Sequence, residues 1–108
     1  MIDREYIEMY VNAVQVAEYR RNEEYEYRTA SIVSAEYGRR FVRIVVDNGT
    51  QRMVHAFVDL TNGDVVKAAG WTAPQRGVNG LAVRFNLLDD ESRENCFARC
   101  GNYGYLYA

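Results

Sequence analysis

The side chains best suited to binding chemistry gather around Trp71, the only tryptophan of the chain. Lys67 and Arg76 flank it in the segment GDVVKAAGWTAPQRG, and Arg84 follows shortly after. An indole ring can stack on a base or carry a cation on its face, and guanidinium groups can hold a phosphate. A loop that folds back over its own strand would gather these residues at one sheet edge. We therefore predict a ligand- or partner-binding site made of Lys67, Trp71, Arg76 and Arg84.

A structural role for Trp71 is the alternative, because a lone tryptophan in a small domain is usually part of the core. In that interpretation Trp71 closes the end of the core between a sheet and the second helix, and Pro74 stiffens the loop. Partial burial with one exposed ring edge would reconcile the two interpretations.

Residues typical of catalysis are few and poorly placed. His55 lies inside an apolar run, and sequence spacing pairs it with no serine or cysteine nucleophile. This favours a half-buried or surface histidine over a general base. The acidic run Asp89–Glu91 could bind a metal, but it more simply begins a helix. Cys96 and Cys100 lack further zinc ligands and are expected to be reduced, half-buried thiols. With no familiar catalytic motif present, the sequence predicts no enzyme activity, no metal and no cofactor.

Composition indicates one domain spanning residues 1–108, since 48% hydrophobic residues suffice for a core at this length. The formal charge of −2 and the pI near 5.4 argue against general binding of nucleic acid. Twelve of the thirteen basic residues are arginine. With neither a signal peptide nor a run of roughly 20 apolar residues, we expect a cytoplasmic protein without membrane contact.

A basic strand is expected where Arg39, Arg40 and Arg43 surround Phe41. Alternation along a strand places Arg43 on the same face as Phe41 and Val45, with Arg40 on the other face. An aromatic ring beside an arginine on a sheet can hold single-stranded nucleic acid, although the RNP signature is missing. A solvated sheet face is the simpler interpretation.

The elements that must position these residues read as an α+β domain. Apolar side chains recur at helical spacing between residues 3 and 21, where Asp3 can cap the helix. Four β-rich runs follow, TASIVSAEY, RFVRIVVD, RMVHAFVDL and DVVKAA, and Asn-Gly pairs after the second and third predict type I′ hairpin turns. We expect an antiparallel meander of four or five strands, packed on one face by the first helix.

In the third run the alternation predicts that the core face carries Val54, Ala56, Val58 and Leu60. The other face, with Met53, His55, Phe57 and Asp59, should stay partly wet. After the glycine-rich loop GWTAPQRGVNG, a shorter helix near residues 89–100 begins at Asp89 or Asp90 and ends at Gly101. The aromatic tail NYGYLYA should return to the sheet or cover the loop. Where the first helix ends within RRNEEYEYR is left open.

Two segments resemble a widespread group of small, mostly uncharacterised phage proteins. GDVVKAAGWTAP is similar to their GDVYKxASWKAPAK-like motif, and AVRFNLLDDESRE to their RxNLLD, before an aromatic GYLY-like end. Thr72 stands where the group usually has lysine, Gln75-Arg76 replaces Ala-Lys, and GVNGL looks like an insertion. The resemblance covers roughly Phe57 to Tyr107 and rests on Lys67, Trp71, Ala73-Pro74, Arg84, Asn86-Leu87 and Tyr105-Leu106-Tyr107. It implies a phage gene of accessory type and brings no known activity.

These observations together favour a small, non-enzymatic phage accessory protein that binds a host protein and modulates a host process. Tyrosine- and arginine-rich surfaces make good binding hot spots, and the chain has nine tyrosines. One alternative is a sponge that binds and sequesters a nucleotide-like small molecule, and another is weak binding of single-stranded nucleic acid. The host, the partner and the oligomeric state, a homo-oligomer included, are left open.

Overall fold

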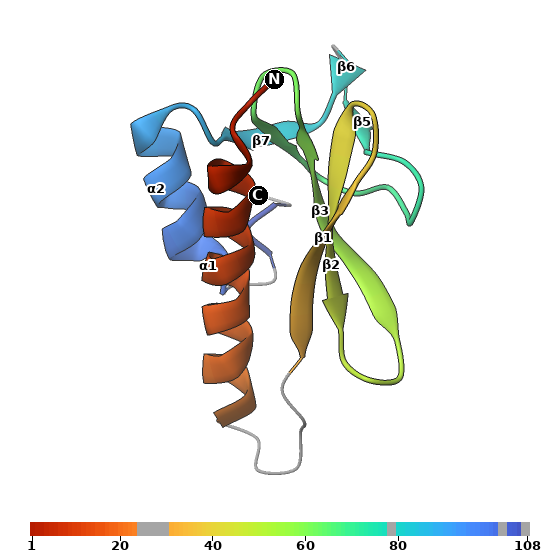
Figure 1. Ribbon diagram of the computed structural model, residues 1–108, viewed down its shortest axis with the longest axis vertical. Helices are drawn as coiled ribbons and strands as arrows, with labels where there is room; N and C mark the ends of the chain where they lie inside the picture. The colour runs from red at the N-terminus through yellow and green to blue at the C-terminus, as the bar shows by residue number, and fades with distance from the viewer. Residues whose placement is uncertain (24–30, 78–79, 102–103, 107–108) are drawn as a thin grey trace.

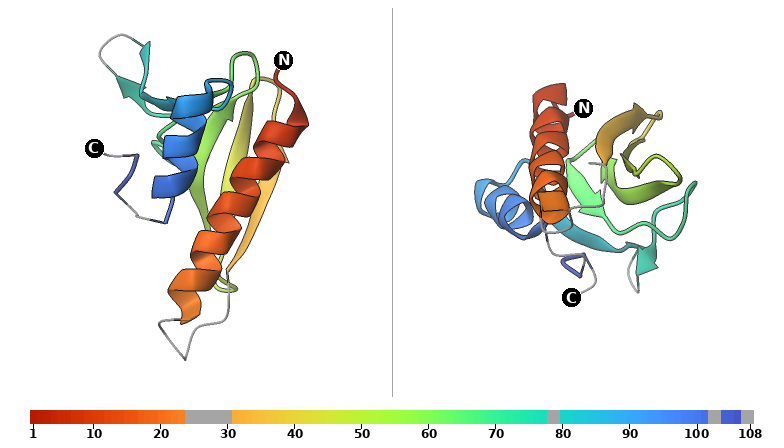
Figure 2. Two further views of the ribbon diagram at one scale, coloured as in Figure 1. Left: turned by 90° about the vertical axis from the view of Figure 1, so that its left-hand side faces the viewer. Right: turned by 90° about the horizontal axis from the view of Figure 1, so that it is seen from below.

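The computed structural model describes residues 1–23, 31–77, 80–101 and 104–106. Its centre is a five-stranded antiparallel sheet, and both helices, α1 (Arg4–Glu23) and α2 (Asp90–Arg99), lie on one side of that sheet (Figures 1 and 2). The strands β5 (Arg76–Gly77) and β6 (Gly80–Leu81) lie on the opposite side (Figure 1). The molecule therefore has a helical layer, a sheet, and a partial third layer that contains β5 and β6.

The sheet has the order β1-β2-β3-β4-β7, and each neighbouring pair is antiparallel. This confirms the predicted α+β fold and the five-stranded meander, with β7 as the strand that the sequence patterns had not delimited. The five strands are β1 (Ile32–Tyr37), β2 (Phe41–Asp47), β3 (Arg52–Asp59), β4 (Asp64–Val66) and β7 (Val83–Asn86). A separate two-stranded hairpin consists of β5 (Arg76–Gly77) and β6 (Gly80–Leu81).

The main core lies between the helices and the sheet. Helix α1 presents Ile7, Tyr10 and Val14 at the three- and four-residue spacing of one helical face, and all three are buried. This confirms the predicted face of the first helix. The sheet contributes Val33, Val42, Ile44, Val46, Ala56, Val58, Leu60 and Val65, while α2 contributes Cys96.

The predicted hairpins are at the right places, but their type I′ turns are wrong. Only Gly49 (φ 93°) and Gly63 (φ 81°) have positive φ in these turns, whereas a type I′ turn needs two such residues. Both connections are four residues long, and Asn48 stabilises the first of them differently. Its side-chain Oδ1 accepts hydrogen bonds from the backbone N–H groups of Thr50 and Gln51, at 3.0 and 2.8 Å.

A bulge in β3 overturns part of the predicted alternation. Ile44 pairs with Ala56 and Val45 pairs with Val54, so His55 is the extra residue. Ala56 and the alternate residues after it face the core as predicted. Val54 lies outside the core cluster, and His55 turns to the helical side, where it contacts Tyr10.

The sheet face opposite the helices is less exposed to solvent than predicted. Val45, Phe57 and Val66 are buried there, although they lie outside the core between helices and sheet. The segment that covers them folds back on itself, with Gln75 N–H donating to the Lys67 carbonyl at 2.7 Å and Ala82 N–H donating to the Gln75 carbonyl at 2.7 Å. We call this sheet side the outer face.

Helix α2 begins as predicted. Asp89 is its N-cap and accepts hydrogen bonds from the backbone N–H groups of Glu91 and Ser92, at 3.1 and 3.4 Å. In the tail, Tyr105 and Leu106 are buried against the core, so this part returns to the sheet. The open end of the first helix, parts of GVNGL and residue Tyr107 lie outside the described residues.

Candidate outer-face binding site

Trp71 lies at the tip of a tight turn on the outer face. The Ala69 N–H donates to the Ala73 carbonyl at 3.0 Å, and Ala68 forms a β-bridge with Pro74, so the two sides of the turn are fixed together. The Trp71 residue is 38% exposed. Partial burial is therefore the observed state, and the interpretation of Trp71 as a core residue between the sheet and the second helix is wrong.

Two arginines of the sheet contact the indole ring of Trp71. The guanidinium carbons of Arg43 and Arg52 lie 4.5 and 5.2 Å from the ring centroid of Trp71, within the range of cation–π contacts. Arg43 belongs to β2 and Arg52 to β3, so a loop residue is held by two neighbouring strands. This arrangement leaves part of the ring open to a partner.

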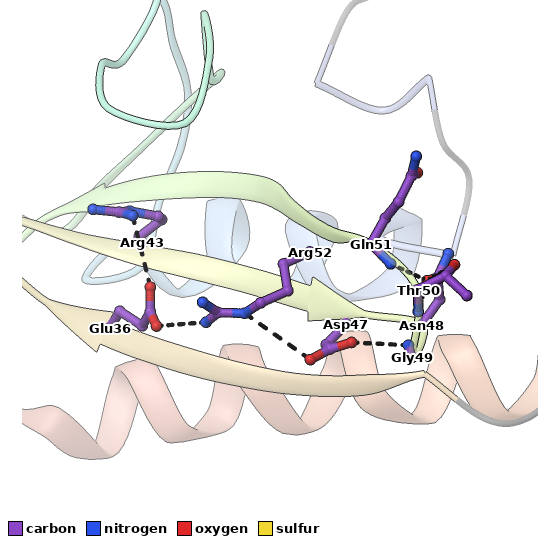
Figure 3. A network of polar contacts seen from close by, with 8 residues as sticks. All are labelled: Glu36, Arg43, Asp47, Asn48, Gly49, Thr50, Gln51 and Arg52. Atoms are coloured by element: carbon purple, nitrogen blue, oxygen red, sulfur yellow. Dashed lines mark hydrogen bonds and ion pairs between the residues drawn. The ribbon is translucent and has the colours of Figure 1, made fainter.

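Carboxylates hold these arginines in place. Glu36 of β1 lies between them, with its oxygens 3.7 Å from Arg43 Nη1 and 2.5 Å from Arg52 Nη2 (Figure 3). Arg52 Nε is also 4.0 Å from the carboxylate of Asp47. The cross-strand pairs Glu36–Arg43 and Asp47–Arg52 follow from the strand register, so β-sheet geometry builds the network.

A cavity of about 250 Å³ adjoins this network beside the turn between β1 and β2. Its basic lining comes from three arginines, of which Arg40 forms an ion pair with the buried Asp59 at 3.0 Å. Arg43 Nε is buried and has no hydrogen-bond partner among the described residues. The lining consists of Glu36, Tyr37, Gly38, Arg39, Arg40, Phe41, Arg43, Phe57, Thr72 and Pro74.

The structure brings the backbone segments that carry Lys67, Arg76 and Arg84 side by side, since the Lys67 N–H donates to the Ala82 carbonyl at 3.2 Å. The backbone of Lys67 is bonded to that of Gln75, next to the exposed Arg76 in β5. Arg84 lies at a β-bulge between β4 and β7 and has no paired residue in β4. Its Nε donates to the Leu106 carbonyl at 2.7 Å. Leu106 belongs to the core on the helical side, whereas Trp71 lies on the outer face. That the four predicted site residues bind a ligand or partner stays a prediction.

The arginines that contact Trp71 were not among the predicted site residues. Arg43 had been singled out with Phe41 and Val45 on one face of the basic strand, and the buried Val45 and the contact of Phe41 with Phe57 agree with that face. Arg52 and Glu36 were missed. The opposite charges of Asp47 and Arg52 across the Asn-Gly connection were the available signal, since a hairpin register brings them face to face.

The helical side holds a buried hydrogen-bond chain. The hydroxyls of Tyr10 and Tyr105 are hydrogen-bonded, and the Tyr105 hydroxyl also lies 2.5 Å from His55 Nε2. Burial, and then the positive charge of Arg21, lowers the pKa of His55 from 6.5 to about 4. Burial raises the pKa of both tyrosines and raises that of the Cys96 thiol to about 12. These groups are neutral at pH 7 and satisfy one another.

A larger cavity of about 680 Å³ lies between α1 and α2. Apolar side chains such as Met9, Val16 and Phe97 dominate its lining, together with Arg20 and Arg21. Arg21 is already engaged, because it donates to Glu18 and to the Gly101 carbonyl, both at 2.7 Å. The outer face is chemically more specific, since it combines an exposed indole, arginines and an unsatisfied donor.

Both cysteines are free thiols, as predicted, and both are fully buried rather than half-buried. In the described part of the chain, no group of three His, Cys, Asp or Glu side chains is placed to hold a metal ion. Neither described helix is long and apolar enough to cross a membrane.

The fold and the site together define an α+β domain that presents an aromatic–arginine cluster on a loop-covered sheet face. The family model "Family of unknown function (DUF7717)" matches residues 3–108, and the chain belongs to this family. No curated protein and no solved structure shows a significant match to the chain.

Proposed function

We propose that the chain is a non-enzymatic, phage-encoded accessory protein that binds a host protein in the host cytoplasm and thereby modulates a host process. The observation that carries the proposal is the partly exposed indole of Trp71, held on Arg43 and Arg52. Tryptophan and arginine are the residue types most enriched at binding hot spots. The phage assignment rests on the sequence resemblance of Phe57–Tyr107.

The charge of the outer face favours a partner with an acidic surface. Arg43 and Arg52 contact Trp71, and Arg39 and Arg40 line the adjoining cavity, while the chain as a whole carries a formal charge of −2. Complementary charge speeds encounter and selects the partner. A partner would place an apolar or aromatic side chain on the exposed edge of the indole and carboxylates beside the arginines.

Affinity capture from a lysate of the host bacterium tests the proposal. The wild-type protein should retain a partner that Trp71→Ala and Arg52→Ala lose, and Arg99→Ala is the matched control because Arg99 is exposed on α2, across the sheet. Each variant is first shown to be folded by its melting curve. Capture of no protein above background, or equal capture by all variants, would overturn the proposal.

A second candidate is a sponge for a nucleotide-like molecule, favoured by the basic cavity beside the Trp71 turn. An indole can stack on a base while arginines hold phosphate. Heat denaturation of the purified protein, followed by mass spectrometry of the released small molecules, tests it. A nucleotide released in stoichiometric amount supports this candidate, and a clean supernatant from protein purified under native conditions contradicts it.

A further inference from the structure

We propose that the cavity beside the β1–β2 turn binds a phosphate monoester group, held by Arg39, Arg40 and Arg43. The inference rests on the proposed function in taking the outer face as the recognition surface. It adds the chemistry of the group that is recognised and the residues that recognise it. Three features of the cavity support it: an unsatisfied donor, an excess of positive charge, and a suitable size.

The unsatisfied donor is Nε of Arg43, which is buried and has no acceptor among the described residues. The same guanidinium reaches Glu36 only at 3.7 Å, which is too long for a hydrogen bond. Nε has no contact with solvent, so a ligand oxygen can satisfy this donor only after neighbouring side chains shift; the Arg43 side chain as a whole is 27% exposed and adds its charge to the cavity. A phosphate offers several such oxygens, and arginine donors suit its geometry.

Charge in the cavity also favours an anion. Arg39 forms no ion pair with any residue that the structure describes, and Arg40 is only partly neutralised because it remains largely exposed beside Asp59. Glu36 is the one carboxylate in the lining. It already pairs with Arg43, which lines the cavity, and with Arg52, which lies outside it. A dianionic group would therefore meet uncompensated positive charge.

The size and the walls indicate a small group. The volume of about 250 Å³ is below the roughly 300–1,000 Å³ of pockets that enclose whole ligands, so the cavity fits a phosphate and the start of its ester. Phe41 and Phe57 form an apolar wall, and Thr72 supplies a hydroxyl from the loop. Gly38 keeps the turn tight, since a Cβ there would lie 2.9 Å from the Phe41 carbonyl oxygen.

The intrinsic fluorescence of Trp71 provides a direct readout, because it is the only tryptophan and contacts Arg43. The probes are inorganic phosphate, AMP and a phosphoserine peptide, with adenosine and the unphosphorylated peptide as controls. Saturable binding of at least one phosphorylated probe, and not of its control, is expected. Affinity should fall as pH drops below about 6, where a phosphate monoester loses its second charge.

Two variants and a matched control test the residues. Arg39→Gln removes an exposed charge, and Arg43→Lys keeps the charge but removes the planar guanidinium. Each should weaken binding about tenfold or more, since each loses a charge-assisted hydrogen bond. Arg99→Gln removes an arginine that is also exposed but lies on the helical side, and should bind like wild type. Isothermal titration calorimetry checks the affinities, and melting curves show that the variants are folded.

The outcomes separate this inference from the proposed function. Preference for AMP identifies a small-molecule source of the phosphate, and preference for the phosphoserine peptide identifies a modified protein; either supports the site. No saturable binding up to 10 millimolar probe, on the order of the weakest specific affinities, overturns it, as does equal binding by Arg39→Gln. Capture of a host protein through Trp71 would still support the proposed function in that case.

Discussion

Mild acid is expected to destabilise this protein through His55, the only histidine of the chain. Its ring lies against Tyr10 and Tyr105 on the helical side of the sheet, with Nε2 at 2.5 Å from the Tyr105 hydroxyl. Burial first, and the nearby charge of Arg21 second, lowers its pKa from 6.5 to about 4. Folding therefore disfavours the protonated ring.

The direction and size of the pH effect on stability follow from this lowered pKa. The stability contributed by neutral His55 is fully present above the unfolded pKa near 6.5 and is lost as the pH falls toward about 4. The difference between the two pKa values corresponds to about 3 kcal/mol when the loss is complete. About 2 kcal/mol of it falls between pH 7 and pH 5, which lowers Tm by roughly 8 °C for a domain of this length.

Thermal unfolding followed by circular dichroism at pH 7, 6 and 5 measures the effect. His55→Gln is the comparison, because glutamine can still hydrogen-bond Tyr105 but does not titrate, and its Tm should change little over this range. Asp59, whose pKa is lowered chiefly by its hydrogen bonds to Thr61 and Arg40 against the effect of burial, loses its contribution only below the usual carboxyl range. It therefore does not interfere.

Equal losses of Tm in wild type and His55→Gln would refute the reasoning. An NMR titration of the His55 ring protons in the wild-type protein gives an independent check, even if the variant folds poorly. A midpoint near 6.5 in the folded state would show that the ring is not held neutral by its surroundings.

Three further outcomes follow from local geometry. Asp89→Ala should lower the free energy of unfolding by about 1 kcal/mol in urea titrations, because α2 loses its N-cap; no change would mean that another group caps the helix. Gly38→Ala should lower Tm, because its Cβ would lie 2.9 Å from the Phe41 carbonyl oxygen; an unchanged Tm would show that the turn adjusts freely. Cys96 and Cys100 are buried, so a thiol reagent should label them only as the protein opens; rapid labelling in native buffer would contradict their burial.

The sequence predicted those parts of the fold that depend on neighbours along the chain. The spacing of Ile7, Tyr10 and Val14 defines one helical face, and that face is the buried one. Asp89 precedes a helix and caps it. Glycines at 49 and 63 mark two strand connections correctly, although four-residue loops replace the predicted two-residue turns. Each of these features is decided within a few residues, where periodicity and capping preferences act.

The features that could not be predicted depend on contacts between distant segments. The bulge at His55 shifts the alternation of β3 by one residue. It is stabilised by the contact of His55 with Tyr105, which lies far along the chain. Likewise, Trp71 meets Arg43 and Arg52 only because the segment after β4 folds back across the sheet. No short-range pattern encodes the direction in which such a segment folds.

The two sheet faces differ in how fully their polar groups are matched, and this difference supports placing function on the outer face. On the helical side, His55 and the two tyrosine hydroxyls satisfy one another. On the outer face, Arg43 keeps a buried donor, Nε, that has no partner in the described part of the chain. The ion pairs of Glu36 with Arg43 and Arg52 are partly exposed, so they add little to stability. An exposed indole and an arginine with one unpaired donor therefore support the proposal that this face binds a partner.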